Sequence, residues 1–462
     1  MARCESFRDP AGFVFRVGDR ILRAVHPGSG QMLREFVALP VAREFVRQGR
    51  LVGTSFPVEP EEPGYEIVEH ERVWFPSFPP EWSPEMLESA AALTLDLAEQ
   101  LLPNGWGLKD ASPHNILFRG PRPVFVDVLS FERRDPGDAL WPAYAQFVRT
   151  FLLPLMAGRY SLARLDQIWL AGREGLEPEQ VYRALSWRRR ITPPALDLVT
   201  MPVWFSPCAE RSPDLYRKNP VAPERAGYTL AAIFRGLRRK LRSLQTRVPQ
   251  KHSNWLRYLE CQTHYSPEQY AAKEAFVSEV LREFSPRTVL DAGANTGHFS
   301  EMAAQAGASV IAIDSDPVLA GELWRRASRK GLDILPLVVD LCRPTPALGW
   351  RNRESPSFLE RASGAFDLVM MLALIHHMLV SERIPLAEIL DFAAQLTTSL
   401  LIVEFVDPAD PMFRRLARGR DALYAHLTQA HFEAACANRF EIVRRLAIEG
   451  SSRTLYLLRR RP

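Results

Sequence analysis

Three aspartates in the second half of the chain stand at the ends of successive short runs of valine, isoleucine, leucine and alanine. They are Asp291, Asp314 and Asp340. If these runs are parallel strands, the carboxylates meet at the carboxyl edge of one sheet, where open α/β sheets bind their ligands. Asp314 follows Asp291 by 23 residues, a spacing that places an acid at the end of the second strand to bind ribose hydroxyls. The alternative is that the three acids are unrelated surface residues.

A glycine turn follows the first of these aspartates. Residues 288–300 read T-V-L-D-A-G-A-N-T-G-H-F-S, which predicts a strand, a small-residue turn from Gly293 to Gly297, and a helix over 296–306. Such a turn lets backbone N–H groups and a helix N-terminus approach a ligand closely. Glycine is needed there because a Cβ would block either the backbone angles or the ligand. The turn and the acid spacing together predict a site for a ligand that carries a ribose.

The elements that must position these residues form a regular alternation. From about residue 257 onward, short apolar β-type runs alternate with amphipathic helical runs, a pattern typical of a parallel sheet covered by helices. The chain ends in two β-type runs, 440–448 and 453–458, joined by the turn sequence E-G-S-S. We therefore predict an α/β domain over 257–462, preceded by a folded region over 1–205 and a linker over 206–256.

Five stretches of the C-terminal domain resemble, in order, the motifs of class I S-adenosylmethionine-dependent methyltransferases. They read V-L-D-A-G-A-N-T-G, V-I-A-I-D, V-V-D-L, F-D-L-V-M-M-L and L-L-I-V-E-F-V, and the resemblance extends over residues 260–459. The stretches A-L-I-H-H-M and F-E-I-V…R-T-L-Y-L-L are similar to bacterial methyltransferase-like proteins of the nodulation type. The resemblance implies a Rossmann-like α/β fold, a seven-stranded doubly wound sheet with a C-terminal antiparallel hairpin.

The resemblance also implies roles for the acidic and glycine residues. The methionine part of S-adenosylmethionine would lie among Asp291, Gly293, Asn295 and Gly297. Asp314 would hold the ribose hydroxyls, and Asp340 would hold the adenine amino group. An acid-rich site suits this cofactor, which carries a sulfonium and an ammonium, better than it suits NAD, which carries a pyrophosphate.

Two adjacent histidines are candidates for a catalytic base. Methyl transfer requires a nucleophile in line with the S–CH₃ bond and often a base that takes its proton. His376 and His377 follow the fourth predicted strand, 366–372, at the same edge of the sheet. Imidazole has the side-chain pKa nearest neutrality, so either residue could serve. The alternative is that both pack or hydrogen-bond locally while positioning drives the transfer.

Two further features border the predicted site. Glu404 ends a β-type run, where it would either orient an acceptor hydroxyl or pair with a nearby arginine, and we favour the pairing. Residues 265–273, Y-S-P-E-Q-Y-A-A-K, resemble the segment that closes over the cofactor in some methyltransferases. The alternative for this segment is an ordinary helix that starts near Ser266 and Pro267.

The N-terminal region carries a second set of polar residues at a characteristic spacing. Asp110 and Asn115 lie five residues apart, and Asp127 follows a β-type run twelve residues later. The segment 108–132 resembles the catalytic hairpin of small-molecule kinases of the aminoglycoside phosphotransferase type. There, one Asp positions the acceptor hydroxyl, and an Asn and a second Asp hold magnesium. The resemblance implies an α+β kinase-like domain over 1–205 with an ATP and Mg²⁺ site at these three residues.

The kinase pattern is incomplete. No lysine occurs in residues 1–108, so the phosphate-binding lysine is absent unless an arginine such as Arg23 replaces it. No G-x-G-x-x-G loop is present, and the metal-binding D-F-G reads D-V-L at 127–129. We therefore expect a degenerate domain that recruits substrate or senses a nucleotide. The alternatives are an active kinase, which would make the protein a bifunctional kinase-methyltransferase, and simple turn capping by the aspartate and asparagine.

The predicted linker contains a basic amphipathic helix. Leucine, isoleucine and phenylalanine recur at helical spacing over residues 230–244, and arginines occupy the opposite face. Such a helix can lie on an anionic membrane surface or bind a polyanion. The alternative, which we favour, is that its apolar face docks on a neighbouring domain. Nucleic acid is not an expected partner, because no recognised nucleic-acid-binding motif accompanies the helix.

Composition excludes several classes of protein. The 462 residues are 47% hydrophobic and 24% charged, with a net charge of +4, which is ordinary for a globular chain. Five scattered cysteines indicate neither a disulfide framework nor a zinc site, and no metal is expected. No apolar stretch approaches the roughly 18 residues of a membrane span. Charges occupy the place of a signal-peptide core, so we expect a cytoplasmic location.

The expected activity is methyl transfer to an acceptor that the sequence does not identify. Association with a kinase-like domain suggests a hydroxyl group of a small molecule or a glycan intermediate. The alternative is a regulator that binds the cofactor or a nucleotide without performing chemistry.

Overall fold

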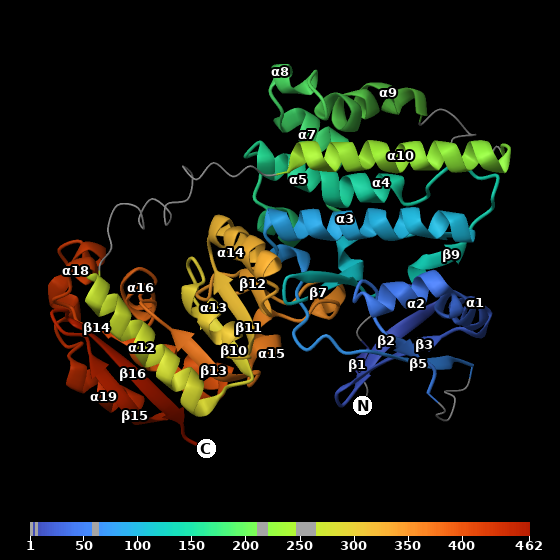
Figure 1. Ribbon diagram of the computed structural model, residues 1–462. Coiled ribbons are helices and arrows are strands. Elements are labelled where there is room, and N and C mark those ends of the chain that lie inside the picture. The colour runs from blue at the N-terminus through green and yellow to red at the C-terminus, as the bar shows by residue number, and fades with distance from the viewer. Residues whose placement is uncertain (1–2, 5–7, 58–63, 210–219, 246–264) are drawn as a thin grey trace. The chain divides into compact units, whose positions relative to one another are not determined.

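The computed structural model describes residues 3–4, 8–57, 64–209, 220–245 and 265–462. The chain divides into two compact units (Figure 1). The first unit comprises Met1–Arg247 with Leu348–Ser355, and the second comprises Val248–Ala347 with Pro356–Pro462.

The first unit contains an antiparallel five-stranded sheet in the order β1-β2-β3-β5-β4. Its strands are β1 (Arg3–Cys4), β2 (Gly12–Val17), β3 (Arg20–Val25), β4 (Thr54–Ser55) and β5 (Glu66–His70). Gly18, with φ of +59°, provides the left-handed residue in the tight turn between β2 and β3. The central strand β3 is buried over its last four residues, which places its side chains in the interior of the unit.

Two small antiparallel sheets and a group of helices complete the first unit. One sheet pairs β6 (Trp106–Leu108) with β9 (Phe131–Arg133), and the other is the hairpin of β7 (Ile116–Arg119) and β8 (Arg122–Phe125). The α-helices are α1 (Pro27–Ala38), α2 (Pro40–Arg47), α3 (Pro84–Leu101), α4 (Tyr144–Phe147), α5 (Leu153–Arg159), α6 (Leu165–Ala171), α7 (Pro178–Ala184), α8 (Trp187–Arg190), α9 (Met201–Ala209) and α10 (Pro223–Leu244).

The basic amphipathic helix is α10, which packs within the first unit. Its apolar side chains, including Leu230 and Phe234, are buried, and the helix contacts α3 and α5 (Figure 1). Arg238, on the flank of α10, forms an ion pair with Glu99 of α3 at 2.7 Å. The structure therefore shows the alternative that we favoured for this helix, in which its apolar face docks on folded protein. The apolar face of α10 is not available to a membrane, although several of its arginines stay exposed.

The second unit contains a seven-stranded sheet in the order β12-β11-β10-β13-β14-β16-β15. The first five strands in this order run parallel, and β16 runs antiparallel to both β14 and β15. The strands are β10 (Thr288–Ala292), β11 (Ser309–Asp314), β12 (Ile334–Val338), β13 (Phe366–Met371), β14 (Thr397–Val406), β15 (Phe440–Ala447) and β16 (Arg453–Arg460). This topology confirms the predicted Rossmann-like sheet with a terminal antiparallel hairpin.

Helices alternate with the strands of the second unit as the sequence pattern predicts (Figure 1). They are α12 (Pro267–Phe284), α13 (His298–Gln305), α14 (Pro317–Lys330), α15 (Phe358–Ala362), α16 (Ile375–Val380), α17 (Leu386–Leu396), α18 (Pro411–Ala417) and α19 (Gln429–Cys436). Local residues set the helix ends. The Ser266 hydroxyl accepts a hydrogen bond from the Gln269 N–H at 3.2 Å and caps α12, and Pro267 occupies its first position.

The core of the second unit joins the sheet to α12. It includes Val289, Val310, Leu368 and Ile402, one from each of four strands, together with Val277 of α12. Burial of these side chains fixes the strand ends relative to one another. Across the described part of the chain, the structure contains no helix with both the length and the apolar character needed to cross a membrane.

Candidate active site

The parallel strands place the three predicted aspartates at one edge of the second unit's sheet. Asp291 is the next-to-last residue of β10, and Asp314 is the last residue of β11. Asp340 follows the end of β12 by two residues. Because β11 pairs with both β10 and β12, the three carboxylates are carried by neighbouring strands at their carboxyl ends. This is the edge at which open α/β sheets bind ligands.

The turn after β10 has the left-handed backbone that its glycines predict. The φ angles of Gly293, Asn295 and Gly297 are +72°, +51° and +78°. The Gly293 N–H donates to the Ile313 carbonyl at 2.9 Å, which ties the turn to β11. A Cβ on Gly297 would lie only 2.3 Å from Leu323 Cδ1 of α14. Glycine is therefore required at 297 both by the backbone conformation and by the contact between α13 and α14.

Asp291 is buried beneath this turn. Its Oδ2 accepts a hydrogen bond from the Ser300 hydroxyl of α13 at 2.5 Å. Burial raises the pKa of Asp291 to about 6, while the Ser300 hydroxyl and the Lys273 ammonium act in the opposite direction. A carboxyl group with this pKa is mostly ionised at pH 7, so Asp291 carries a negative charge at that pH.

The other two acids differ in how firmly they are held. Asp314 accepts two backbone hydrogen bonds at 2.9 Å, one from Asn295 in the turn and one from Asp316. Burial raises the pKa of Asp314 against the effect of these N–H groups. Asp340 is partly exposed, and its Oδ2 lies 3.5 Å from Arg343 Nε. Asp314 is thus fixed by two backbone N–H groups, whereas Asp340 accepts one, from Cys342 to Oδ1 at 2.9 Å, in addition to its surface ion pair.

The two predicted histidines lie in α16, which follows β13. Their ring centroids are 4.3 Å apart. His376 is buried, and its Nδ1 has no hydrogen-bond partner among the described residues. Burial lowers the pKa of His376 to about 3, with His377 and Arg453 contributing, and burial together with Arg453 lowers the pKa of His377 to about 4. Both imidazoles are therefore neutral at pH 7.

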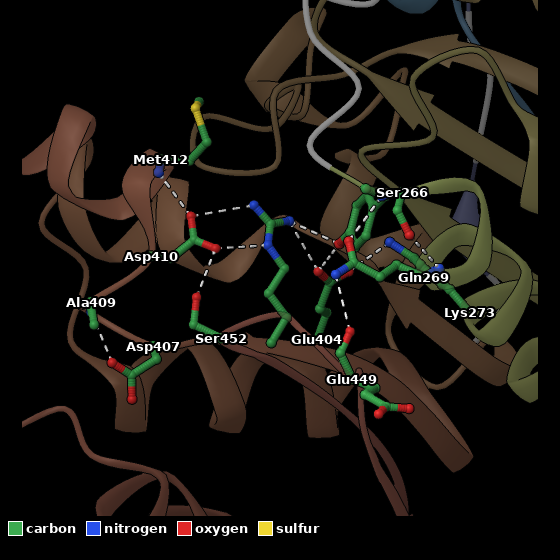
Figure 2. A network of polar contacts seen from close by, with 12 residues as sticks. Ser266, Gln269, Lys273, Glu404, Asp407, Ala409, Asp410, Met412, Glu449 and Ser452 are labelled. Atoms are coloured by element: carbon green, nitrogen blue, oxygen red, sulfur yellow. Dashed lines mark hydrogen bonds and ion pairs between the residues drawn. The ribbon is translucent and has the colours of Figure 1, made fainter.

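A buried network of charged side chains links α12 to the ends of β14 and β16 (Figure 2). Glu404 of β14 has no exposed surface, and its Oε2 accepts a hydrogen bond from Lys273 Nζ at 2.6 Å. Its Oε1 accepts hydrogen bonds from the Tyr265 hydroxyl and from Arg453 Nη1. Arg453 Nε also donates to Asp410 Oδ2 at 3.0 Å. The predicted pairing of Glu404 with an arginine is confirmed.

The network is electrically balanced. Lys273 and Arg453 oppose Glu404 and Asp410, and the Tyr265 hydroxyl accepts from Arg453 at 2.8 Å while it donates to Glu404. Although burial acts to raise the pKa of Glu404, the two cations lower it to about 2. An ion pair this deeply buried is costly to break, because removal of one partner leaves an uncompensated charge. The segment 265–273 is therefore held firmly against β14.

Sequence reasoning did not identify Lys273, Arg453 and Asp410 as members of this network. Their partners lie far away in sequence, for example 131 residues between Lys273 and Glu404. The feature that brings Glu404 and Arg453 together is the register of the two strands that carry them. Val406 of β14 pairs with Arg453 of β16, so Glu404, two residues earlier, faces the same side of the sheet as Arg453.

The polar residues predicted in the first unit also lie together. The Ser130 hydroxyl donates to Asp127 Oδ2 at 2.5 Å and accepts from Asn115 Nδ2 at 3.2 Å. Arg23 Nη1 lies 2.8 Å from Asp127 Oδ1. Burial acts to raise the pKa of Asp127, but Arg23 and Ser130 hold it below its usual range. Burial and the nearby Asp127 raise the pKa of Asp110.

Arg23 occupies one oxygen of the Asp127 carboxylate in this first-unit cluster. Its guanidinium lies 2.8 Å from Asp127 Oδ1, so the charge of the carboxylate is paired within the chain. Among the described residues, no group of three or more histidine, cysteine, aspartate or glutamate side chains is arranged to hold a metal. Arg23 is the arginine that the sequence indicated as a replacement for the missing lysine.

Comparison with known proteins assigns the chain to a family. Residues 263–440 match a family model described as a methyltransferase domain. Nodulation protein NoeA of Rhizobium meliloti (strain 1021) is 32% identical over 470 residues, which cover 98% of this chain and 95% of NoeA. The chain belongs to the NoeA family. Its second unit is a class I S-adenosylmethionine-dependent methyltransferase domain, and the protein is a methyltransferase.

Several solved structures match part of this chain. N-methyltransferase NodS from Bradyrhizobium japonicum WM9 is 15% identical with a TM-score of 0.32, over 43% of this chain and 99% of NodS. Magnesium protoporphyrin IX methyltransferase from Synechocystis PCC 6803 is 19% identical with a TM-score of 0.32, over 45% of this chain and 93% of that one. The bifunctional kinase-methyltransferase WbdD is 18% identical with a TM-score of 0.31, over 44% and 41% of the two chains.

The residues at the sheet edge fit S-adenosylmethionine. The buried Oδ1 of Asn295 has no hydrogen-bond partner among the described residues, and it is an acceptor that a donor such as the methionine ammonium would satisfy. The largely ionised Asp291 would supply a negative charge for the cationic end of such a cofactor. Asp314, fixed by two backbone N–H groups, would receive its hydroxyl groups.

Proposed function

We propose that the second unit transfers the methyl group of S-adenosylmethionine to a hydroxyl group of a small molecule or a glycan intermediate. The observation that carries this proposal is the unpaired buried nitrogen of His376 at the edge that also bears the three acids. A polar atom in this state needs a partner, and an acceptor hydroxyl beside the cofactor would provide one.

In this proposal one group of residues holds the cofactor, and the two histidines orient the acceptor. Asp291 and Asn295 hold the methionine part of the cofactor, Asp314 the ribose hydroxyls and Asp340 the adenine amino group, while Gly293 and Gly297 allow the turn to approach it. When bound, S-adenosylmethionine supplies an electrophilic methyl group on a sulfonium. The chain contributes orientation, since holding two reactants at near-attack distance removes much of the entropic barrier.

The histidines act mainly by positioning. An imidazole whose conjugate acid has a pKa of about 3 or 4 is a weak base. It is therefore a poor acceptor of the proton of an alcohol at neutral pH. A neutral imidazole is nevertheless a good hydrogen-bond partner for a hydroxyl group. His376 and His377 would therefore orient the acceptor oxygen toward the methyl group, and solvent would take the proton after transfer.

A radiolabelled methyl-transfer assay with a panel of acceptors tests the proposal. The panel contains oligosaccharides and small polyols as hydroxyl acceptors, and matched amines and carboxylates as controls. We expect transfer to a hydroxyl compound, and a large loss of kcat in His376→Asn with little change in affinity for the cofactor. Transfer to amines alone would contradict the acceptor class. Intact cofactor binding without transfer to any acceptor would favour the non-catalytic regulator.

For the first unit we propose a degenerate kinase-like domain that recruits substrate or senses a nucleotide. The support is the Arg23–Asp127 ion pair, which occupies the carboxylate that a phosphotransferase would give to magnesium. Calorimetry with MgATP tests it, using the wild type and Asp127→Asn. ATP hydrolysis or phosphate transfer that Asp127→Asn abolishes would instead show a working kinase and a bifunctional enzyme.

A further inference from the structure

Large apolar side chains are exposed on α8, directly after it, and on α9 of the first unit. Trp187, Ile191, Met201, Trp204 and Phe205 have exposed fractions between 43% and 67%. They are five of the fifteen large hydrophobic residues exposed in the described part of the chain, and they fall within 19 consecutive positions. Together with the arginines of α8, we call them the α8–α9 cap. Clustered exposure of this kind marks an interaction site more often than chance.

The two helices of the α8–α9 cap meet at a common residue. The Trp204 indole N–H donates to the Tyr182 hydroxyl of α7 at 3.2 Å. The guanidinium of Arg190 lies 4.0 Å from the centre of the same Tyr182 ring. The Thr200 hydroxyl donates to the Arg190 carbonyl at 2.6 Å, which ties the residue before α9 to the end of α8. The exposed aromatic residues of α8 and α9 therefore belong to one packed structure.

The α8–α9 cap is also basic. Residues 183–205 contain four arginines, at 183, 188, 189 and 190, and one acid, Asp197, which gives a net charge of four minus one, or +3. Asp197 pairs with Lys240 of α10 at 3.2 Å. No carboxylate of the described residues pairs with any of the four arginines. The guanidinium of Arg188 lies 5.4 Å from the Trp187 ring centre, so cationic and aromatic groups are interleaved on this surface.

We propose that the α8–α9 cap binds the surface of an anionic membrane. Tryptophan and phenylalanine at the headgroup boundary place an apolar ring in the acyl region, and tryptophan keeps its N–H in the wet layer. Arginines with no acidic partner among the described residues complement the phosphates of anionic lipids. Protein interfaces also favour tryptophan, phenylalanine, methionine and arginine, so a protein partner is the outcome that the test below has to separate from membrane binding. A polyanion would leave isoleucine, methionine and phenylalanine without a role.

Vesicle flotation with the full-length protein tests this proposal. The probes are vesicles of phosphatidylcholine alone and of phosphatidylcholine with phosphatidylglycerol, at low and high salt. We expect binding to the anionic vesicles only, and weakening by salt. Replacing Trp187, Trp204 and Phe205 by alanine should lower binding about tenfold for each side chain that buries about 60 Å² of apolar surface. Arg188→Ser with Arg189→Ser should lower it about fivefold per residue.

A matched control separates membrane binding from general attraction to negative charge. Arg235 and Arg239 are exposed arginines of α10 that belong to neither helix of the α8–α9 cap, so their replacement by serine should change vesicle binding less than twofold. Every replaced side chain is exposed, so all variants should stay folded. The Trp204 variant also loses its hydrogen bond to Tyr182, and its melting temperature should fall by no more than about 4 °C. An equal loss in the α10 variant, or no loss in the aromatic variant, would overturn the proposal. So would a dimer in light scattering that dissociates when Trp204 is replaced, because the cap would then be covered by a second copy.

Discussion

Replacement of Lys273 by methionine is expected to shift cofactor binding to higher pH. Lys273 Nζ lies 2.6 Å from Glu404 Oε2, and its charge also lowers the pKa of Asp291, which burial raises to about 6. The other groups that act on Asp291 are the Ser300 hydroxyl, which lowers its pKa, and the Asp314 carboxylate, which raises it. Without the ammonium, burial and Asp314 are opposed mainly by Ser300, so the pKa of Asp291 rises.

The size of the shift follows from the charge that is lost. Removal of a neighbouring opposite charge moves a carboxyl pKa by about 1 to 3 units. Asp291 in Lys273→Met would then titrate between about pH 7 and 9. If the ionised carboxylate is the form that binds the cationic end of the cofactor, the competent fraction at pH 7 falls from about nine-tenths to between about a half and a hundredth. The affinity for S-adenosylmethionine at pH 7 should therefore fall by about twofold to a hundredfold.

Calorimetric titration with S-adenosylmethionine at pH 6, 7, 8 and 9 measures this effect. Binding follows ionisation, so the wild-type affinity should rise with pH through about 6 and then level off, because that is the pKa of Asp291. The affinity of Lys273→Met should keep rising above pH 7. Glu404→Gln keeps the ammonium and should level off as the wild type does. The double variant Lys273→Met with Glu404→Gln avoids an uncompensated buried carboxylate. Equal affinities of wild type and Lys273→Met at every pH would refute the reasoning.

Three other perturbations have expected outcomes. Gly297→Ala places a Cβ 2.3 Å from Leu323 at φ of +78° and should lower the free energy of unfolding by about 2 to 3 kcal/mol in urea. Gly307→Ala, at φ of +97° with no atom within 4 Å of its Cβ, should cost only about 1 kcal/mol, and equal losses would contradict the packing argument. Because the pKa values of His376 and His377 are about 3 and 4, the pH profile of kcat at saturating cofactor should show no histidine inflection between pH 5.5 and 8. An inflection in that range that disappears in His376→Asn would instead show that His376 is a general base. The pKa of Glu404 is lowered to about 2, so its stabilisation is full above the unfolded-state value of about 4.5 and is lost as pH falls toward 2. The loss should reach about 3 kcal/mol in denaturant titrations, and a wild-type acid response in Glu404→Gln would argue against it.

The features that sequence predicted well depend on local signals. The turn after β10 needs residues with a left-handed backbone conformation. The residue type of Gly293 and Gly297 is enough to predict that conformation at both positions. Strand ends followed by aspartate gave the positions of Asp291 and Asp314 to within a residue. The terminal hairpin was marked by its turn residues, and β15 and β16 match the predicted runs within two residues at each end.

Features that depend on contacts between residues far apart in the chain could not be predicted from local sequence patterns. Nothing near Lys273 in sequence indicates that it is buried beside Glu404, because that contact requires α12 to pack on the end of β14. The neutrality of His376 has the same origin, since burial in the folded unit lowers its pKa. The spacing of Asp127 did predict a polar cluster in the first unit. Sequence left open whether Arg23 takes the place of the missing lysine, and the structure shows that it pairs with Asp127 itself.

Calorimetric titration of the purified full-length chain with S-adenosylmethionine tests the central claim most directly. We expect one site of micromolar affinity in the wild type. Asp314→Ala should lower the affinity by about 30-fold or more, because the hydrogen bonds that the ribose hydroxyls would donate to its carboxylate are lost. A folded wild-type protein that gives no heat with the cofactor, or an Asp314→Ala variant that binds and methylates as the wild type does, would contradict the account.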